Sequence, residues 1–100
     1  MLTRTITATE HPIARVEDPL SGRVMELTGT QPGVQFYTGN FLDGTAIGKS
    51  GHAYRQSDGM ALEPQVFPDT PNQPAFGSAR LDPGKTYRNV FTYRFSTSAR

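Results

Sequence analysis

Glu63 is an acid whose neighbours restrict its backbone. It stands between Leu62 and Pro64 in the stretch ALEPQ. A residue that precedes proline is held in the β or polyproline region, so Glu63 is expected on an extended backbone. A carboxylate on a stiff backbone suits a general base, because its oxygens keep a constant position relative to a substrate proton. The alternative is a solvent-exposed glutamate on the polar face of a strand, and the pattern alone favours that alternative.

Gln35 offers a second polar side chain, 28 residues earlier in the chain (63 − 35 = 28). It lies between Val34 and Phe36 in GVQFYTG, on the opposite strand face from both. An amide can donate and accept hydrogen bonds to a ligand, although a strand glutamine is more often solvated or satisfied by a neighbour. Tyr37 shares the face of Gln35, and its ring would either stack on the apolar side of a ligand or pack in the core.

The other residues that could do chemistry have simpler explanations. The two histidines invite a general-acid role, but His11 lies in a polar N-terminal stretch and His52 in a glycine-rich loop. Neither has an orienting partner in the sequence, so we interpret both as surface histidines. Asp43 and Asp58 each precede a glycine, which turn formation explains.

Short alternating stretches between glycines and prolines must position these side chains. Ten Gly and eight Pro are spread over the chain and argue against long helices. Strands are predicted in RVMELTGT, where Met25 and Leu27 share a face, in GVQFYTG, and around Glu63. Pro64 places the last of these at an edge, at a bulge or at a strand end.

The C-terminal stretch TYRNVFTYRFS has the clearest strand pattern, with a period of two from Tyr87 to Phe95 that Asn89 and Val90 interrupt. The stretches DPLSG, FLDG and LDPG are typical of turns. TAIGKSGHAYRQSDG (residues 45–59) is predicted to be a long loop or a pair of loops, of a length that is often functional. FPDTPNQPAFG (residues 67–77) is predicted to be irregular. Together these patterns predict an antiparallel all-β fold with little or no helix.

Composition narrows the function classes. One hundred residues suit a single domain, and a net charge of +1 without a basic cluster gives no field for steering nucleic acid. The absence of cysteine excludes disulfides, thiolate zinc sites and cysteine nucleophiles, and two histidines disfavour an all-protein transition-metal site. The first twenty residues contain no long apolar run, so we expect no signal peptide or membrane anchor and a cytoplasmic location.

Three longer strings keep a consistent order and spacing: DPLSGRVMELTGTQPGVQFYTGNFLDGT (residues 18–45), ALEPQVFPDTPNQPAF (61–76) and LDPGKTYRNVFTYRFS (81–96). They closely resemble the C-terminal part of the aldose 1-epimerases, the galactose mutarotases, over residues 13–96. The resemblance implies an antiparallel β-sandwich that is part of a larger mutarotase-type supersandwich. It also implies an isomerase of carbohydrate metabolism that interconverts the α and β anomers of aldohexoses such as glucose and galactose by acid–base ring opening.

The resemblance assigns roles by motif. The glutamate of LE.Q, here Glu63, would be the general base that removes the proton of the anomeric hydroxyl. The glutamine of GVQFYTGN, here Gln35, would contact the sugar, and the spacing of the two residues agrees with the family. Because partial burial suits a carboxylate base that acts near neutral pH, we expect Glu63 to be partly buried. No metal or organic cofactor is implied, since acid–base chemistry suffices.

The family's general-acid histidine, second substrate histidine, sugar-binding arginine and substrate aspartate belong to upstream motifs that this chain lacks. The resemblance therefore implies a truncated or split form, with residues 1–12 as an unmatched extension and residues 13–100 as the C-terminal region of the sandwich. Open strand edges and an open inner face would then favour self-association, or a partner chain that supplies the missing strands and histidines. The alternative function is a non-catalytic carbohydrate-binding β-module, and a third is a structural remnant without a ligand.

Overall fold

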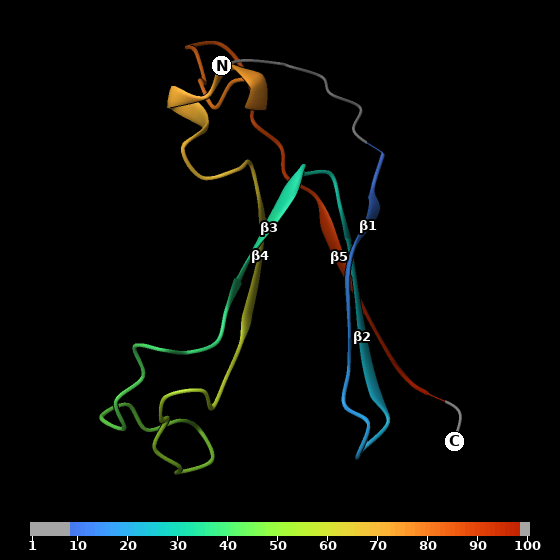
Figure 1. Cartoon of the computed structure of the whole chain (residues 1–100), viewed down its shortest axis with the longest axis vertical. Helices are drawn as coiled ribbons and strands as arrows, with labels where there is room; N and C mark the ends of the chain where they lie inside the picture. Colours follow the sequence, from blue (N-terminus) through green and yellow to red (C-terminus); the bar gives the residue numbers. More distant parts are fainter. Residues whose placement is uncertain (1–8, 99–100) are drawn as a thin grey trace.

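The computed structural model describes residues 9–98, and most of their regular structure is β-strand (Figure 1). Three strands form sheet A: β1 (His11–Glu17), β2 (Arg23–Gly29) and β5 (Phe91–Thr97), in the order β1-β2-β5. Both neighbouring pairs in this sheet are antiparallel. Strand β2 is thus the central strand, between β1, which precedes it in the sequence, and β5, which is the last strand in the described residues.

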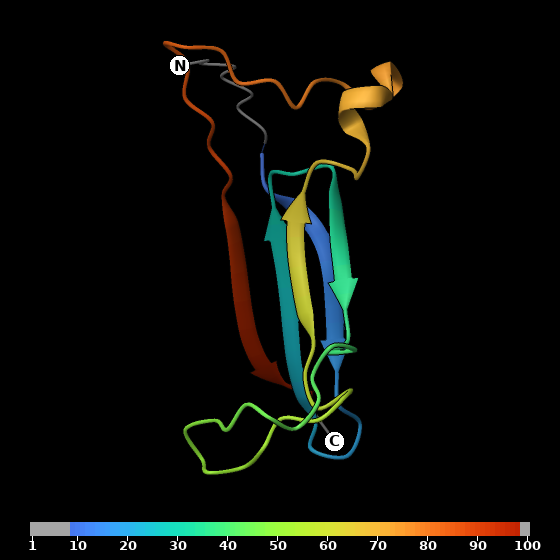
Figure 2. The ribbon, with the colours of Figure 1, turned by 90° about the vertical axis from the view of Figure 1, so that its left-hand side faces the viewer.

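Sheet B has two antiparallel strands, β3 (Gly33–Tyr37) and β4 (Ala61–Gln65). The long connection of residues 38–60 joins them, and two short 3-10 helices, η1 (Thr70–Asn72) and η2 (Pro74–Phe76), follow β4. Figure 2 shows sheet B in front of sheet A, with the long connection at one end of the strands and the 3-10 helices at the other. The predicted antiparallel all-β fold is confirmed.

The core lies on β2. Val24 and Leu27, which are 4% and 1% exposed, are the buried hydrophobic side chains among residues 9–98. Leu27 is flanked in the sheet by Ala14 on β1 and Tyr93 on β5. The β1–β2 pairing shifts register between Pro12 and Ala14, which is a β-bulge. A core of this size is small for one hundred residues.

The alternating pattern predicts a nine-residue strand that begins at Tyr87, whereas β5 begins at Phe91. The predicted start of this strand was wrong. The backbone amide of Val90 donates to the Thr30 hydroxyl (3.2 Å), and the Val90 carbonyl accepts from the Thr30 amide (3.0 Å). The side chain of Asn89 turns instead toward sheet B. Regular pairing with β2 therefore starts at Phe91, where Gly29 is the partner.

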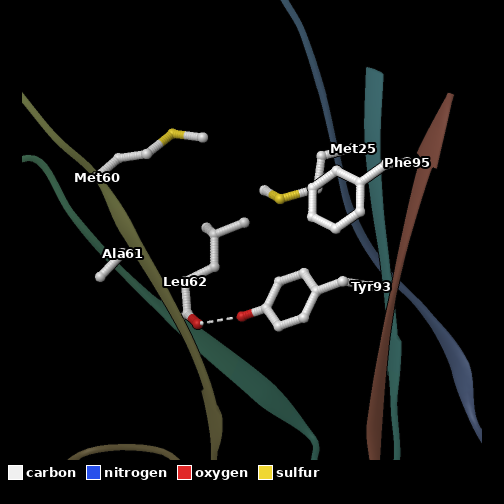
Figure 3. A pocket seen from close by; sticks show the side chains of 6 residues that line it. All are labelled: Met25, Met60, Ala61, Leu62, Tyr93 and Phe95. Carbon is white, nitrogen blue, oxygen red and sulfur yellow. Dashed lines mark hydrogen bonds between the residues drawn. The ribbon is translucent and has the colours of Figure 1, made fainter. Parts of the chain in front are cut away.

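Two side-chain hydrogen bonds join sheet A to sheet B. The Tyr93 hydroxyl donates to the Leu62 carbonyl (3.2 Å), and the Asn89 amide donates to the Pro64 carbonyl (2.9 Å). Beside the first bond, the sheets separate around an open hollow of about 360 Å³ (Figure 3). Its lining is apolar apart from one hydroxyl: Met25, Met60, Ala61, Leu62, Tyr93 and Phe95.

Residues 1–8 of the expected extension (residues 1–12) lie outside the described residues. His11 and Pro12 belong to β1 and pair with Gly29 and Thr28, so the last two positions of that extension are part of sheet A. The boundary at residue 12 stays a prediction. Within residues 9–98, no helix has the length and apolar character needed to cross a membrane.

Candidate active site

Gln35 and Glu63 lie directly opposite each other on β3 and β4. Their neighbours Val34 and Pro64 form the next pair, and proline has no N–H to donate to the ladder. Val34 and Pro64 must therefore be a non-hydrogen-bonded pair, which makes Gln35 and Glu63 a hydrogen-bonded pair with Cα atoms about 5.5 Å apart. Side chains of opposite residues project from the same face, so the backbone brings the amide and the carboxylate together.

The face that carries Gln35 and Glu63 points away from sheet A. Alternation places Val34 and Leu62 on the other face, and Leu62 lines the hollow between the sheets. Both Gln35 and Glu63 are exposed, so the partial burial expected for Glu63 was wrong. The physical reason is that no segment among residues 9–98 covers the part of this face that carries the two side chains. Among residues 9–98, no hydrogen bond or ion pair engages the Glu63 carboxylate, while the Gln35 amide makes one long contact with the Phe36 carbonyl (3.5 Å).

The carbonyl groups on either side of Glu63 are fixed by side chains from the C-terminal part of the chain. The Leu62 and Pro64 carbonyls point to the edge of β4 that faces away from β3, because the ladder bonds use the residues between and beyond them. Tyr93 and Asn89 donate to these two carbonyls. These two carbonyls are thus satisfied without a third strand, and the backbone that carries Glu63 is held from both sides.

Sequence reasoning missed Asn89 and Tyr93 as residues that support the site. The available signal was Asn89, a polar residue that interrupts an aromatic row. The Asn89 side-chain oxygen is buried and has no hydrogen-bond partner among the described residues. The bond from its amide to the Pro64 carbonyl offsets part of the cost of burying this side chain.

Comparison with known proteins gives the family. The sequence profile described as aldose 1-epimerase matches residues 3–94. The chain belongs to the aldose 1-epimerase family. It is 52% identical to the galactose mutarotase of Mus musculus over 85 residues, which is 85% of this chain and 25% of that protein. It is 51% identical to the galactose mutarotase of Homo sapiens over 89 residues, or 89% of this chain and 26% of that protein.

A bacterial aldose 1-epimerase, that of Escherichia coli (strain K12), is 40% identical over 68 residues, covering 66% of this chain and 19% of its own length. The chain thus spans about a quarter of the length of the mammalian relatives that it matches. The match to the family profile begins at residue 3, whereas the resemblance seen in the sequence motifs begins at Ile13. The family resemblance predicted from the motifs is confirmed.

Neither histidine of this aldose 1-epimerase family chain contacts the Gln35–Glu63 pair. His11 pairs with Gly29 in sheet A, and the His52 carbonyl accepts from the Gly48 amide (3.0 Å) in the long connection. Both are exposed, as expected for surface histidines. Among the residues that the structure describes, no hydrogen bond or ion pair joins a histidine to Glu63.

The acids that precede glycines have turn roles. Asp43 accepts from the hydroxyl (2.6 Å) and the amide (3.0 Å) of Thr45, and these donors hold the pKa of its carboxyl below the ordinary value. Asp58 accepts from the Arg55 amide (2.8 Å) and guanidinium (3.2 Å), which likewise lower its pKa. Residues 9–98 contain no group of three His, Cys, Asp or Glu side chains placed to hold a metal ion.

Proposed function

We propose that this chain contributes the sugar-facing base to an aldose 1-epimerase reaction on an aldohexose. The observation that carries the proposal is the direct pairing of Gln35 with Glu63 on one open face. The resemblance to the family implies a catalytic role for Glu63 and a sugar-contacting role for Gln35. The backbone pairing sets their carboxylate and amide side by side, at a spacing that one pyranose can bridge.

The proposed chemistry moves two protons and breaks one bond. Glu63 takes the proton of the anomeric hydroxyl, and an acid gives a proton to the ring oxygen as the C1–O5 bond breaks. The open-chain aldehyde rotates about C1–C2. The reverse proton transfers then close the ring as either anomer. Gln35 would hold a sugar hydroxyl by donating or accepting a hydrogen bond, which keeps the anomeric hydroxyl against Glu63.

In this proposal the acid comes from outside residues 9–98, because the family's histidine motifs are not in this range and no hydrogen bond within it orients the side chain of His11 or His52. A second polypeptide, or a second copy of the chain, would cover the open face and present an imidazolium to the ring oxygen. Such cover would also reduce the exposure of Phe41, which is 90% exposed and stacks on Tyr37, a residue on the same face of β3 as Gln35. A monodisperse, stable monomer in light scattering would count against this partner.

Polarimetry of α-D-glucose and α-D-galactose tests the catalytic proposal. We expect the chain to speed the approach to anomeric equilibrium above the spontaneous rate. Without the acid, its rate should be about 10²–10⁴ below that of a complete acid–base pair. Imidazolium buffer should then supply the missing acid and increase the rate increment, which is the rate with the protein minus the rate in the same buffer alone.

Glu63→Gln keeps the size of the side chain and removes the base, so this variant should lose both the increment and its response to imidazolium. Glu26→Gln is the matched control, because Glu26 is also a strand glutamate but lies on β2 in the other sheet. Equal rates for wild type and Glu63→Gln would rule out the catalytic role of Glu63.

One observation favours a second candidate, a carbohydrate-binding module without catalysis: no acid partner for Glu63 is present in residues 9–98. Calorimetric titration with D-galactose separates this candidate from a structural remnant. Binding with no rate increment supports the module, and loss of that binding in Gln35→Ala places the sugar on the same face. The cytoplasmic location stays a prediction.

A further inference from the structure

An aromatic ring borders the face that carries Gln35 and Glu63. A Cβ atom built on Gly33 would meet the Cε1 and Cδ1 atoms of Phe67 at 2.7 and 2.8 Å. The ring therefore occupies the space into which a side chain at position 33 would project. Gly33 and Gln35 are two residues apart on β3, so this is the face of Gln35 and of its partner Glu63.

The distance between this ring and the polar pair suits a sugar ring. Two strand residues span about 7 Å, so the Phe67 ring begins about one pyranose width along the strand from Gln35. Glycine at position 33 lets the ring lie close to the backbone instead of standing away from it. The ring and the polar pair thus bound one patch of the open face.

The position of Phe67 is fixed by the turn that follows it. The Thr70 amide donates to the Phe67 carbonyl (3.2 Å), the Thr70 hydroxyl donates to the same carbonyl, and Thr70 is only 2% exposed. Asp69 has a left-handed backbone (φ 66°), and its carboxylate accepts from the side-chain amides of Asn72 (2.6 Å) and Gln73 (3.0 Å). The irregular segment after β4 is therefore closed by its own hydrogen bonds.

A second ring supports the first. Phe76, at the end of η2, packs edge to face on Phe67, with ring centroids 5.2 Å apart and an interplanar angle of 61°. Phe67 and Phe76 remain 40% and 45% exposed. The short helices after β4 thus bring Phe76 into contact with the Phe67 ring above Gly33, and both rings keep exposed surface for a ligand.

We infer that Phe67, backed by Phe76, is a substrate-positioning wall that takes the C–H face of the pyranose whose anomeric hydroxyl meets Glu63. The inference rests on the proposed function. One face of a pyranose carries C–H groups of weak positive charge, and the face of an aromatic ring is negative. Sites for small polar ligands combine such apolar walls with a few placed polar groups, here Gln35 and Glu63.

Backbone-amide NMR titration of the full chain with D-galactose tests the wall. Gly33→Ala displaces the ring without removing it, and Phe67→Ala removes it. We expect each variant to bind about three- to tenfold more weakly than wild type. Gly59→Ala is the matched control, because a Cβ at Gly59 meets nothing within 4 Å, and its affinity should be unchanged. If Phe67→Ala disorders residues 67–77, Gly33→Ala decides the result.

A direct readout separates a sugar wall from a purely structural ring. In wild type we expect nuclear Overhauser contacts between the Phe67 ring protons and the sugar C–H protons, and their loss in Gly33→Ala. Suppose that sugar affinity falls in Gln35→Ala but is unchanged in Gly33→Ala and Phe67→Ala. This result would contradict the substrate-positioning role of Phe67 and leave the proposed function standing. Absence of galactose binding by the wild-type chain overturns both.

Discussion

Sheet A and sheet B differ in what stabilises them. Sheet A has a central strand with buried Val24 and Leu27, and this strand pairs with β5 over its whole length and with β1 from Val24 to Gly29. Sheet B has two strands, and one of its faces is open. An isolated pair of strands is marginal in water, so sheet B depends on its attachment to sheet A. The residues proposed for chemistry lie on the weaker sheet, and those that stabilise the fold lie on the stronger.

The largest expected effect is the loss of the core of sheet A. Leu27→Ala removes a side chain that is 1% exposed, so it should lower the free energy of unfolding by about 2–5 kcal/mol. Phe36→Ala on β3 removes a larger side chain that is 56% exposed and should cost much less. Urea denaturation followed by circular dichroism measures both. Equal losses would mean that the two sheets contribute equally to stability.

A smaller effect is expected at the attachment between the sheets. Asn89→Ala removes the hydrogen bond to the Pro64 carbonyl and should cost about 0.5–1.5 kcal/mol. Hydrogen exchange should show faster amide exchange in β3 and β4 than in wild type, with β1 and β2 little changed. Tyr93→Phe removes the bond to the Leu62 carbonyl and should act in the same direction. Uniform acceleration over both sheets would contradict a separate attachment of sheet B.

The smallest effect is expected from acid. The Ser21 hydroxyl and the Leu20 amide lower the pKa of Asp18 in the β1–β2 turn, and the Asn72 and Gln73 side chains lower that of Asp69 after β4. A folded-state pKa below the unfolded value stabilises the fold above that value, and the contribution is lost as pH falls. Both segments should therefore loosen only below about pH 3.8, the ordinary value for these carboxyls.

Asp69→Asn should remove the acid response of residues 67–77 and leave that of the β1–β2 turn, whereas Asp18→Asn should do the reverse. An NMR pH titration that follows the amides of Ser21 and Gln73 measures both responses. An acid response of Gln73 that persists in Asp69→Asn would show that another group controls the segment after β4.

The sequence predicted which side chains share a strand face better than it predicted what surrounds those side chains. Alternation and the motifs placed Gln35 and Glu63 on strands, but their direct pairing depends on how residues 38–60 close, which no local pattern encodes. The burial of Glu63 was predicted wrongly, because burial depends on what covers a face and not on its own residues. The role of Phe67 was also missed, since a segment rich in proline gives no periodic signal.

Strand β1 had no predicted counterpart. In HPIARVE the alternation is short, Pro12 stands near the start, and a bulge follows it, so the period of two is broken where a strand would be recognised. Strand β5 was placed too early because the aromatic spacing continues through Tyr87, although Asn89 and Val90 are used by other partners. In both strands, specific contacts outweighed the local pattern.

Pro64 also protects the pairing of sheet B against error during folding. If β4 slipped by one residue against β3, Glu63 would project toward sheet A and Leu62 toward solvent. The same slip would bring Pro64 into a position where the ladder needs an N–H that proline lacks, so the misaligned sheet would lose a hydrogen bond. The aligned sheet loses none. A residue next to the proposed base therefore penalises the misaligned arrangement that would turn the base toward sheet A.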